Sequence, residues 1–468
     1  MYGTLFTVLK ERKNMDVFDK IAGYEKQKKD LRYISDMWKN TNEYRRLGVK
    51  IPKGVMFNGD PGNGKTLMAQ CLIDAAGCAF EKCTKDRAQD EFIVHLKEVF
   101  KKAEDYAKSN NKPVIVFFDD MDKFAETSKD TENPEEYAIL QSLLDSIKDY
   151  DVFFVATVNS CGAFPKSLIR SGRIDETFFI LKPSVLDSEK VADYYLRKQN
   201  INIKDVSGRY ITQMTEGVSC AELESIINEA GMYAAFERSD CITKKHIDWA
   251  IMRIEFKINV AGKLERTYDK SNPNCREFAY HEAGHAAVAL LSENFIPTIL
   301  FIDDLKENCS FCYSHNKNNG SQYNNSIERV FIDFGGKAGA SIGFGPLTLG
   351  SNLDLREAWK NLYWNVSKDC VEDLHMFNPI DNRDSLQGEL FKDRLDATTE
   401  KMSNAYNFVV ELLNLNRALL DALADRLMEK YFITADEISE IFEEYKSKHK
   451  VVTIRDLMAT RSQTLASA

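Results

Sequence analysis

Two histidines placed four residues apart are the first feature of the sequence that could carry chemistry. The stretch FAYHEAGHAAVALL, residues 278–291, holds His281 and His285, with Glu282 directly after the first histidine. On a helix, both imidazoles would lie on one face and could bind a single Zn²⁺. Glu282 could then act as general base on a zinc-bound water that attacks a peptide carbonyl. The spacing predicts a zinc peptidase site, although an apolar core helix can carry the same letters.

A catalytic zinc needs a third protein ligand and one open position. The candidate is Asp354 in TLGSNLDLREAW, an acid near the start of a later predicted helix. Glu357 lies three residues further along the same helical face and is the fallback.

A second constellation, in the first half of the chain, is suited to binding a nucleotide. GDPGNGKT, residues 59–66, matches the phosphate-binding pattern G-x-x-x-x-G-K-[ST] and lies between an apolar strand-like run and a predicted helix. Backbone N–H groups at a helix N-terminus favour phosphate, Lys65 would reach the β- and γ-phosphates, and Thr66 would ligate Mg²⁺. The residues predicted to bind ATP are Gly59, Asp60, Pro61, Gly62, Asn63, Gly64, Lys65, Thr66, Leu67 and Asp119.

Polar residues at the ends of two further strand-like runs would complete this site. VIVFFDD ends in Asp119, expected to hold Mg²⁺ through a water, and Asp120, expected to orient the attacking water. ATVNS ends near Asn159, which could hydrogen-bond the γ-phosphate region. In SLIRSGRIDE, Arg170 and Arg173 could act on a neighbouring subunit's nucleotide as arginine fingers, or could form ordinary surface ion pairs.

Composition limits the classes of protein that need to be considered. The chain has 468 residues, 44% of them hydrophobic, and a net charge of −10, which argues against a general nucleic-acid binder. No run of eighteen apolar residues occurs, so we expect no transmembrane helix. The N-terminus makes a poor signal peptide, and the ten cysteines are scattered, which favours a cytoplasmic enzyme with reduced thiols.

The order of strand-like and helix-like segments predicts several domains. Up to about residue 180, buried strand-like runs alternate with helical segments, which indicates a parallel sheet covered on both faces. Helical periodicity follows, and then a polar stretch containing Gly and Pro precedes the HEAGH helix. The predicted boundaries are a nucleotide-binding α/β part (1–185), a helical lid (186–258), a linker (259–274), a zinc peptidase domain (275–450) and a C-terminal tail (451–468).

Taken together, these motifs resemble the FtsH family of ATP-dependent zinc proteases. The segments FDKIAGYEKQKKDL, GDPGNGKT, SLIRSGRID, EGVSCAELESIINEA, AYHEAGHA and GSNLDL occur in the family's order along nearly the whole chain. The resemblance implies a doubly wound α/β AAA+ ATPase with a helical lid, followed by a mainly helical peptidase. It also implies Asp354 as third zinc ligand, a homo-hexamer, arginine fingers at Arg170 and Arg173, polypeptide substrates, and ATP, Mg²⁺ and Zn²⁺ as cofactors.

The sequence departs from the family pattern at four places. We expect none of the family's N-terminal membrane helices, and Asp120 replaces the water-orienting glutamate. The pore loop has no glycine, and Phe92 is its nearest aromatic substitute, unless Phe92 belongs to the core. GGKAGAS, residues 335–341, lacks two acids that the family carries near the zinc region.

Three functions remain open at this point. An ATP-driven processive protease leads, because the phosphate loop, the arginine segment and the HEAGH helix occur together on one chain. An ATP-regulated zinc peptidase that does not thread substrate is the second. The third is a non-proteolytic AAA+ remodeller with a vestigial peptidase.

Overall fold

The computed structural model describes fourteen stretches of the chain, which divide into two compact units, Met1–Ile258 and Asn259–Ala468. The described residues are 16–83, 89–124, 134–147, 150–160, 162, 164–199, 202–215, 217–258, 273–302, 310–317, 323–345, 351–367, 389–430 and 432–466.

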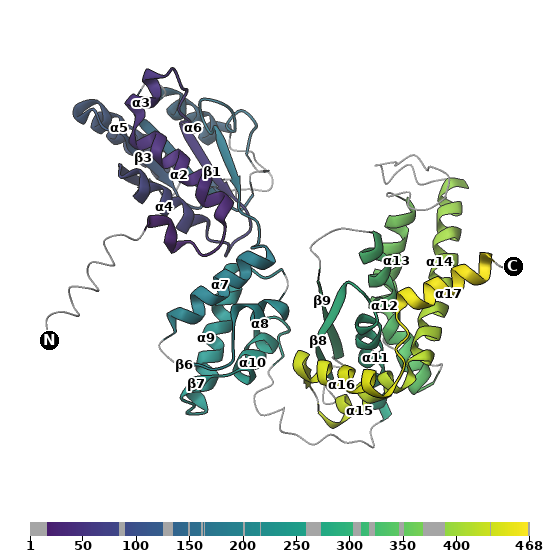
Figure 1. Ribbon diagram of the computed structural model, residues 1–468. Helices are drawn as coiled ribbons and strands as arrows, with labels where there is room; N and C mark the ends of the chain where they lie inside the picture. Colours follow the sequence, from purple (N-terminus) through teal and green to yellow (C-terminus); the bar gives the residue numbers. More distant parts are fainter. Residues whose placement is uncertain are drawn as a thin grey trace. The chain divides into compact units, whose positions relative to one another are not determined.

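A five-stranded parallel sheet lies at the centre of the first unit, in the order β2-β3-β4-β1-β5 (Figure 1). Its strands are β1 (Gly54–Asn58), β2 (Ala79–Cys83), β3 (Val114–Phe118), β4 (Val152–Val158) and β5 (Glu176–Phe179). β1, β3 and β4 are buried along their whole lengths, which is why they appear in the sequence as continuous apolar runs.

Helices cover both faces of this sheet. Successive strand residues point to opposite faces, so Phe117 packs in one apolar cluster with α2 and α4, and Phe118 packs in another with α5 and α6. The predicted doubly wound α/β fold is confirmed. The helical elements around the sheet are η2 (Val17–Lys20), α2 (Glu25–Lys39), α3 (Thr41–Arg46), α4 (Lys65–Ala76), α5 (Gln89–Asn110), η3 (Met121–Phe124) and α6 (Pro134–Ser146).

The rest of the first unit is the helical lid. It contains α7 (Val185–Lys198), β6 (Asn202–Ile203), α8 (Gly208–Gln213), α9 (Cys220–Phe236), β7 (Cys241–Ile242) and α10 (Lys244–Ile254). A capping box starts α9, because the Ser219 side chain accepts from the Glu222 N–H while the Glu222 carboxylate accepts from the Ser219 N–H. This cap fixes the helix start that faces the nucleotide loop.

The second unit is mainly helical, as predicted, around a small antiparallel sheet ordered β10-β8-β9. Its elements are α11 (Pro273–Leu290), β8 (Phe295–Ile302), β9 (Ser310–Asn316), α12 (Tyr323–Gly343), α13 (Asn352–Ser367), α14 (Glu389–Leu415), α15 (Arg417–Glu429), β10 (Phe432–Thr434), α16 (Ala435–Lys448) and α17 (Ile454–Ala466). Glycines let α11 and α12 approach closely: a Cβ on Gly284 would lie 2.1 Å from the Gly335 carbonyl oxygen.

Some boundaries differ from the expected ones. Residues 451–468, expected as a tail, include α17, whose Ile454 and Leu457 are buried in the core of the second unit. Helix α11 begins at Pro273, and the remainder of the expected linker, residues 259–272, lies outside the described residues.

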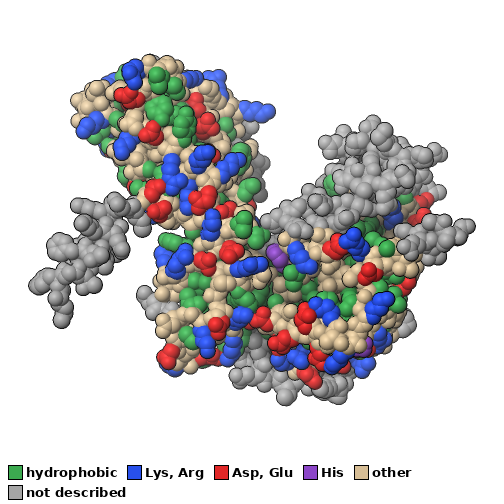
Figure 2. All heavy atoms as spheres, in the orientation of Figure 1, with side chains coloured by type: hydrophobic (Ala, Val, Ile, Leu, Met, Phe, Trp, Pro, Cys, Tyr) green, Lys and Arg blue, Asp and Glu red, His purple; other side chains and the backbone are tan. Residues whose placement is uncertain are grey.

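The described part of the chain contains no helix that is both long and apolar enough to cross a membrane. Acidic and basic side chains are interspersed on the face of each unit drawn in Figure 2.

Candidate functional site

The phosphate-binding loop lies between β1 and α4, as its sequence predicts. Gly62 and Gly64 take φ values of +82° and +83°, which side chains with a Cβ rarely adopt. Lys65 begins α4 and donates to the carbonyl oxygens of Gly59 (2.7 Å) and Asp60 (3.0 Å) and to Asn159 Oδ1 (2.9 Å). The loop is therefore tied to the end of β4 by a hydrogen bond between Lys65 and Asn159, each of which was predicted as a site residue.

The residues predicted to hold magnesium also meet. Thr66 Oγ1 donates to Asp119 Oδ1 at 3.0 Å, and Lys82 Nζ lies 3.0 Å from Asp119 Oδ2. Burial opposes ionisation of Asp119, but hydrogen bonds from Lys82, Thr157 and Thr66 outweigh it and lower the pKa of that carboxyl. Asp119 is therefore held as an anion at the place where Mg²⁺ would be bound.

Thr157, which no sequence motif indicated, joins the two acids that follow β3. Its hydroxyl donates to Asp119 Oδ1 at 2.9 Å and accepts from the Asp120 backbone N–H at 2.8 Å. Asp120 has a φ of +53°, so this fully buried threonine holds it in an unusual backbone conformation. Thr157 is on β4, two residues before Asn159, which directly follows the strand, so the two-residue spacing was the available sequence signal.

The lid reaches the loop within the same unit. The Ala221 N–H donates to the Gly62 carbonyl oxygen at 3.0 Å, and a Cβ on Gly62 would lie 3.0 Å from the Ala221 Cβ. Together the loop and lid enclose a cavity of about 500 Å³, lined by residues 61–68, Asp120 and Asn159, and by Tyr194 and Tyr195 of α7. Of the predicted nucleotide ligands, Gly59, Asp60 and Asp119 lie beside this cavity rather than among the residues that line it.

The two arginines have different environments. Arg173 is buried and donates to both carboxylate oxygens of Asp145, at 2.9 and 2.7 Å, and to the Ser167 carbonyl at 2.6 Å. Arg170 is exposed, and its side chain has no hydrogen bond or ion pair to any residue that the structure describes. Arg173 is thus engaged within its own chain, whereas the Arg170 guanidinium remains available.

Phe92 is a core residue. Its side chain is fully buried on α5 and its ring packs against Phe118 with centroids 5.8 Å apart. Residues 84–88, which precede α5, lie outside the described part of the chain. Phe92 therefore does not replace the pore aromatic.

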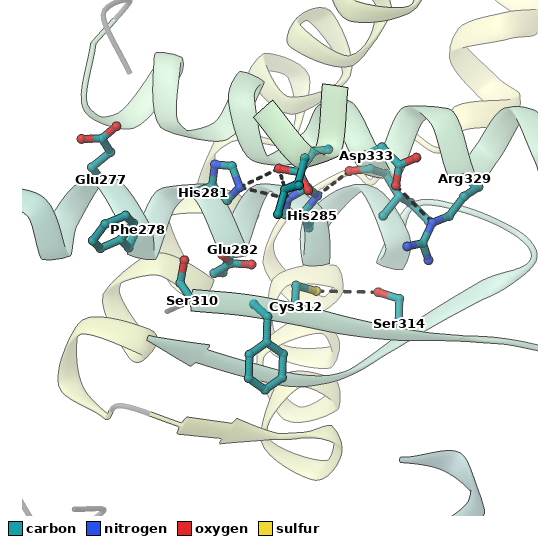
Figure 3. Close-up of a pocket in the computed structure, with 14 residues that line it drawn as sticks. Glu277, Phe278, His281, Glu282, His285, Ser310, Cys312, Ser314, Arg329 and Asp333 are labelled. Atoms are coloured by element: carbon teal, nitrogen blue, oxygen red, sulfur yellow. Dashed lines mark hydrogen bonds and ion pairs between the residues drawn. The ribbon is translucent and has the colours of Figure 1, made fainter. Parts of the chain in front are cut away.

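The predicted zinc ligands converge in the second unit (Figure 3). His281 and His285 lie one turn apart on α11 with Nε2 atoms 3.2 Å apart, and Asp354 in the first turn of α13 lies opposite them. Asp354 Oδ2 is 3.1 Å from His281 Nε2 and 3.6 Å from His285 Nε2. Two ligand atoms that are each ~2.05 Å from one tetrahedral Zn²⁺ lie roughly 3.3 Å from each other. The distances between the His281, His285 and Asp354 ligand atoms are close to that value, so these three residues fit Zn²⁺. The fallback Glu357 is exposed and pairs with Lys360 instead.

Two features outside the ligand set shape this centre. The Ile332 carbonyl accepts from His285 Nδ1 at 2.6 Å, which leaves Nε2 directed toward the metal site without either of the missing family acids. Gly336 of α12 faces the same point, because a Cβ there would lie 2.3 Å from His285 Nε2 and 2.5 Å from His281 Nε2. Only a glycine leaves this space open.

The acidic groups of this centre favour a positive charge beside them, so a bound Zn²⁺ would displace a proton from His285. Although burial opposes it, Asp354 and Glu282 raise the pKa of His285 to about 9, and the two histidines lower the pKa of Asp354. Burial raises the pKa of Glu282 against the opposing effect of both histidines. Glu282 lies beside the ligands in a cavity of about 490 Å³, where it could take up and release a proton.

Comparisons with known proteins agree with the predicted AAA+ fold. Residues 55–181 match the ATPase family associated with various cellular activities (AAA), and residues 202–249 match the AAA+ lid domain. The first unit is thus an AAA ATPase module with its lid.

Along most of its length the chain is also similar to FtsH proteases, so the predicted resemblance is confirmed. It is 29% identical to "ATP-dependent zinc metalloprotease FtsH 1" of Alkaliphilus metalliredigens over 92% of this chain and 74% of that protein. It is 28% identical to the FTSH 9 chloroplastic/mitochondrial protease of Oryza sativa subsp. japonica (93% and 57%) and 27% identical to FtsH of Ureaplasma parvum (91% and 60%). The chain therefore spans little more than half the length of some relatives.

Proposed function

We propose that the chain is an ATP-dependent zinc metalloendopeptidase. The observation that carries this proposal is the convergence of His281, His285 and Asp354 beside a buried Glu282, on a chain that also has a complete phosphate loop. The relatives' names point to the same activity.

In the peptidase unit, bound Zn²⁺ would polarise the peptide carbonyl and acidify the attacking water. Glu282 would take the proton of that water and deliver it to the departing amine, a task for which its raised pKa suits it. Ile332 would keep His285 oriented throughout.

In the ATPase unit, Lys65 would exchange its contacts with the Gly59 and Asp60 carbonyls for the β- and γ-phosphates. Asp119 and Thr66 would hold Mg²⁺, Asp120 would orient the attacking water, and Asn159 would contact the γ-phosphate. Arg170 would act on a neighbouring subunit's nucleotide in a homo-hexamer. Nucleotide turnover would then unfold polypeptides and move them to the zinc sites. The scattered cysteines support a cytoplasmic location.

A second candidate is a zinc peptidase that ATP regulates but that does not thread its substrate. The burial of Phe92 favours it, because that side chain cannot grip a polypeptide. A folded, tagged substrate separates the two candidates, since only a threading enzyme would degrade it faster with ATP.

Cleavage of a quenched fluorescent peptide, measured with zinc content, tests the peptidase. We expect about one zinc per chain in wild type and in Glu282→Gln, with cleavage lost only in the variant. Zinc binding without cleavage by wild type would instead support the vestigial-peptidase alternative.

A further inference from the structure

Among its described lining residues, the peptidase cavity has one cationic side chain that the proposed chemistry does not use. Arg329, on α12, lines the cavity near the His285 end of the ligand set (Figure 3). Its Nε donates to Asp333 Oδ1 at 3.1 Å, and its side chain is 48% exposed. The two terminal nitrogens of the guanidinium have no hydrogen bond to any residue that the structure describes.

Asp333 is an unusual partner for such an arginine. Pairs at i and i+4 on helix surfaces normally expose both partners, as Arg417 and Asp421 do in this unit, at 41% and 37%. Asp333 is only 7% exposed, and its Oδ2 has no hydrogen-bond partner among the described residues. A buried, half-satisfied carboxylate costs stability. The Asp333 carboxylate accepts from Nε of Arg329 and so holds one edge of the guanidinium. The edge with the two terminal nitrogens is left facing the cavity.

The opposite wall is suited to an extended peptide. β9 is the edge of its sheet and, within the described residues, pairs only with β8. Ser310, Cys312 and Ser314 of β9 line the cavity in that order, from Glu282 toward Arg329 (Figure 3). An added strand along this edge would pass the metal ligands and then the guanidinium.

Charge is distributed unevenly along this path. Glu277 and Phe278 line the end away from Arg329, and Glu282 lies between them and Arg329 (Figure 3). Asp354, which also lines the cavity, lies beside His281. Arg329 is the one arginine or lysine among the described residues that line the cavity. A free guanidinium edge binds a carboxylate through two parallel hydrogen bonds.

We propose that Arg329, held by Asp333, forms an anionic subsite that selects peptides carrying a carboxylate a few residues to the His285 side of the cleaved bond. This inference rests on the proposed peptidase function. The carboxylate can come from an Asp or Glu side chain or from a free C-terminus.

Peptides that differ in one residue test the subsite. In the first series, the peptides are amidated at the C-terminus, and Glu, Gln or Lys is placed in turn at each of four positions on either side of the cleaved bond. The second series has a free C-terminal carboxylate. Cleavage kinetics are measured for wild type, and peptide affinity by fluorescence anisotropy in the zinc-loaded Glu282→Gln variant. At one position we expect about ten-fold or greater preference for Glu over Gln. A preference confined to the free-carboxylate series would assign the subsite to chain ends.

Substitutions at position 329 test whether Arg329 causes the preference for Glu over Gln. Arg329→Gln should bring the Glu-to-Gln ratio close to one, and Arg329→Lys should keep part of it. Lys360→Gln, which removes an exposed charge on α13, should leave the ratio unchanged. Zinc content and thermal unfolding establish that each variant is folded.

Two results would overturn the inference. If wild type cleaves the peptides but shows a Glu-to-Gln ratio near one at every position, the subsite is refuted while the proposed peptidase stands. If the preference for Glu persists in folded Arg329→Gln, another residue must cause it. Failure of any peptide to be cleaved or bound would remove the proposed peptidase, and the subsite with it.

Discussion

Replacing Gly336 by alanine should abolish zinc binding while leaving the fold intact. The new Cβ would lie 2.3 Å from His285 Nε2 and 2.5 Å from His281 Nε2, whereas contacts under 3.0 Å essentially do not occur. The nitrogens must therefore retreat by about 0.5 to 0.7 Å or more, out of the ~2.0–2.1 Å reach of a zinc–nitrogen bond. The Cβ would also occupy part of the space that the metal needs.

The cost to the metal-free fold should be small. The clashing atoms are ends of side chains that can rotate, and the lost His285–Ile332 hydrogen bond costs about 1 kcal/mol. Alanine is favoured over glycine within a helix by a similar ~1 kcal/mol. The two effects nearly cancel, so the variant should unfold at a free energy close to that of metal-free wild type.

Zinc analysis and thermal unfolding with and without a chelator measure both effects. Wild type should hold about one zinc per chain and lose stability when chelator is added, and Gly336→Ala should hold almost none and not respond. Gly339→Ala is the matched control, because its Cβ would meet backbone atoms, the Tyr280 oxygen at 2.4 Å and the Gly284 Cα at 2.8 Å. It should lower stability by ~1–3 kcal/mol by separating α11 from α12. A Gly336→Ala protein with full zinc content would refute the assigned metal position.

Three further predictions concern other described contacts. Thr157→Val removes the hydroxyl that joins Asp119 to the Asp120 backbone, so ATP hydrolysis should fall about 10- to 100-fold with nucleotide affinity little changed; an unchanged hydrolysis rate would exclude a positioning role. Burial raises the pKa of Asp333 to about 6 from 3.8, so wild type should lose stability as pH rises from 4 to 6. Asp333→Asn should lack this loss and become more stable than wild type by up to ~3 kcal/mol above pH 6 in urea unfolding, and parallel pH profiles would contradict the reasoning. Arg173→Ala should destabilise the ATPase unit because it removes a buried side chain with its hydrogen bonds to Asp145 and to the Ser167 carbonyl, while Arg170→Ala should leave unfolding unchanged and lower only the ATPase rate of the assembled protein; equal destabilisation by both would contradict this distinction.

Local spacing was enough to predict the parts of both sites that lie on one element. The phosphate loop follows from its glycines and lysine between a strand and a helix, and His281, Glu282 and His285 follow from one helical turn. Asp354 is more than sixty residues away, and it was preferred to Glu357 only as an acid near the start of a later helix, a choice that the resemblance to a family then supported. Phe92 showed the limit of local reasoning, because an aromatic on an amphipathic helix can face either the core or solvent.

The parts that could not be predicted arise from packing between distant segments. The Ile332 carbonyl orients His285 only because α12 lies against α11, and a backbone oxygen leaves no mark in the sequence. The sequence shows a glycine at position 336, but its role depends on which face of α12 is turned toward the two histidines. Lys82 reaches Asp119 across neighbouring strands that are distant in the chain, and Arg329 faces the zinc cavity because Asp333 is buried beside it.

Degradation of an unfolded, unlabelled protein tests the central claim most directly, when wild type, Glu282→Gln and Lys65→Ala are compared with zinc present and with or without ATP. If the chain is an ATP-dependent zinc protease, the substrate should be degraded only by the wild-type protein in the presence of ATP. The two variants should fail to degrade it for different reasons. Glu282→Gln should still hydrolyse ATP, and Lys65→Ala should still cleave short peptides. Equal degradation by wild type and Lys65→Ala, with or without ATP, would contradict the coupling of the two sites.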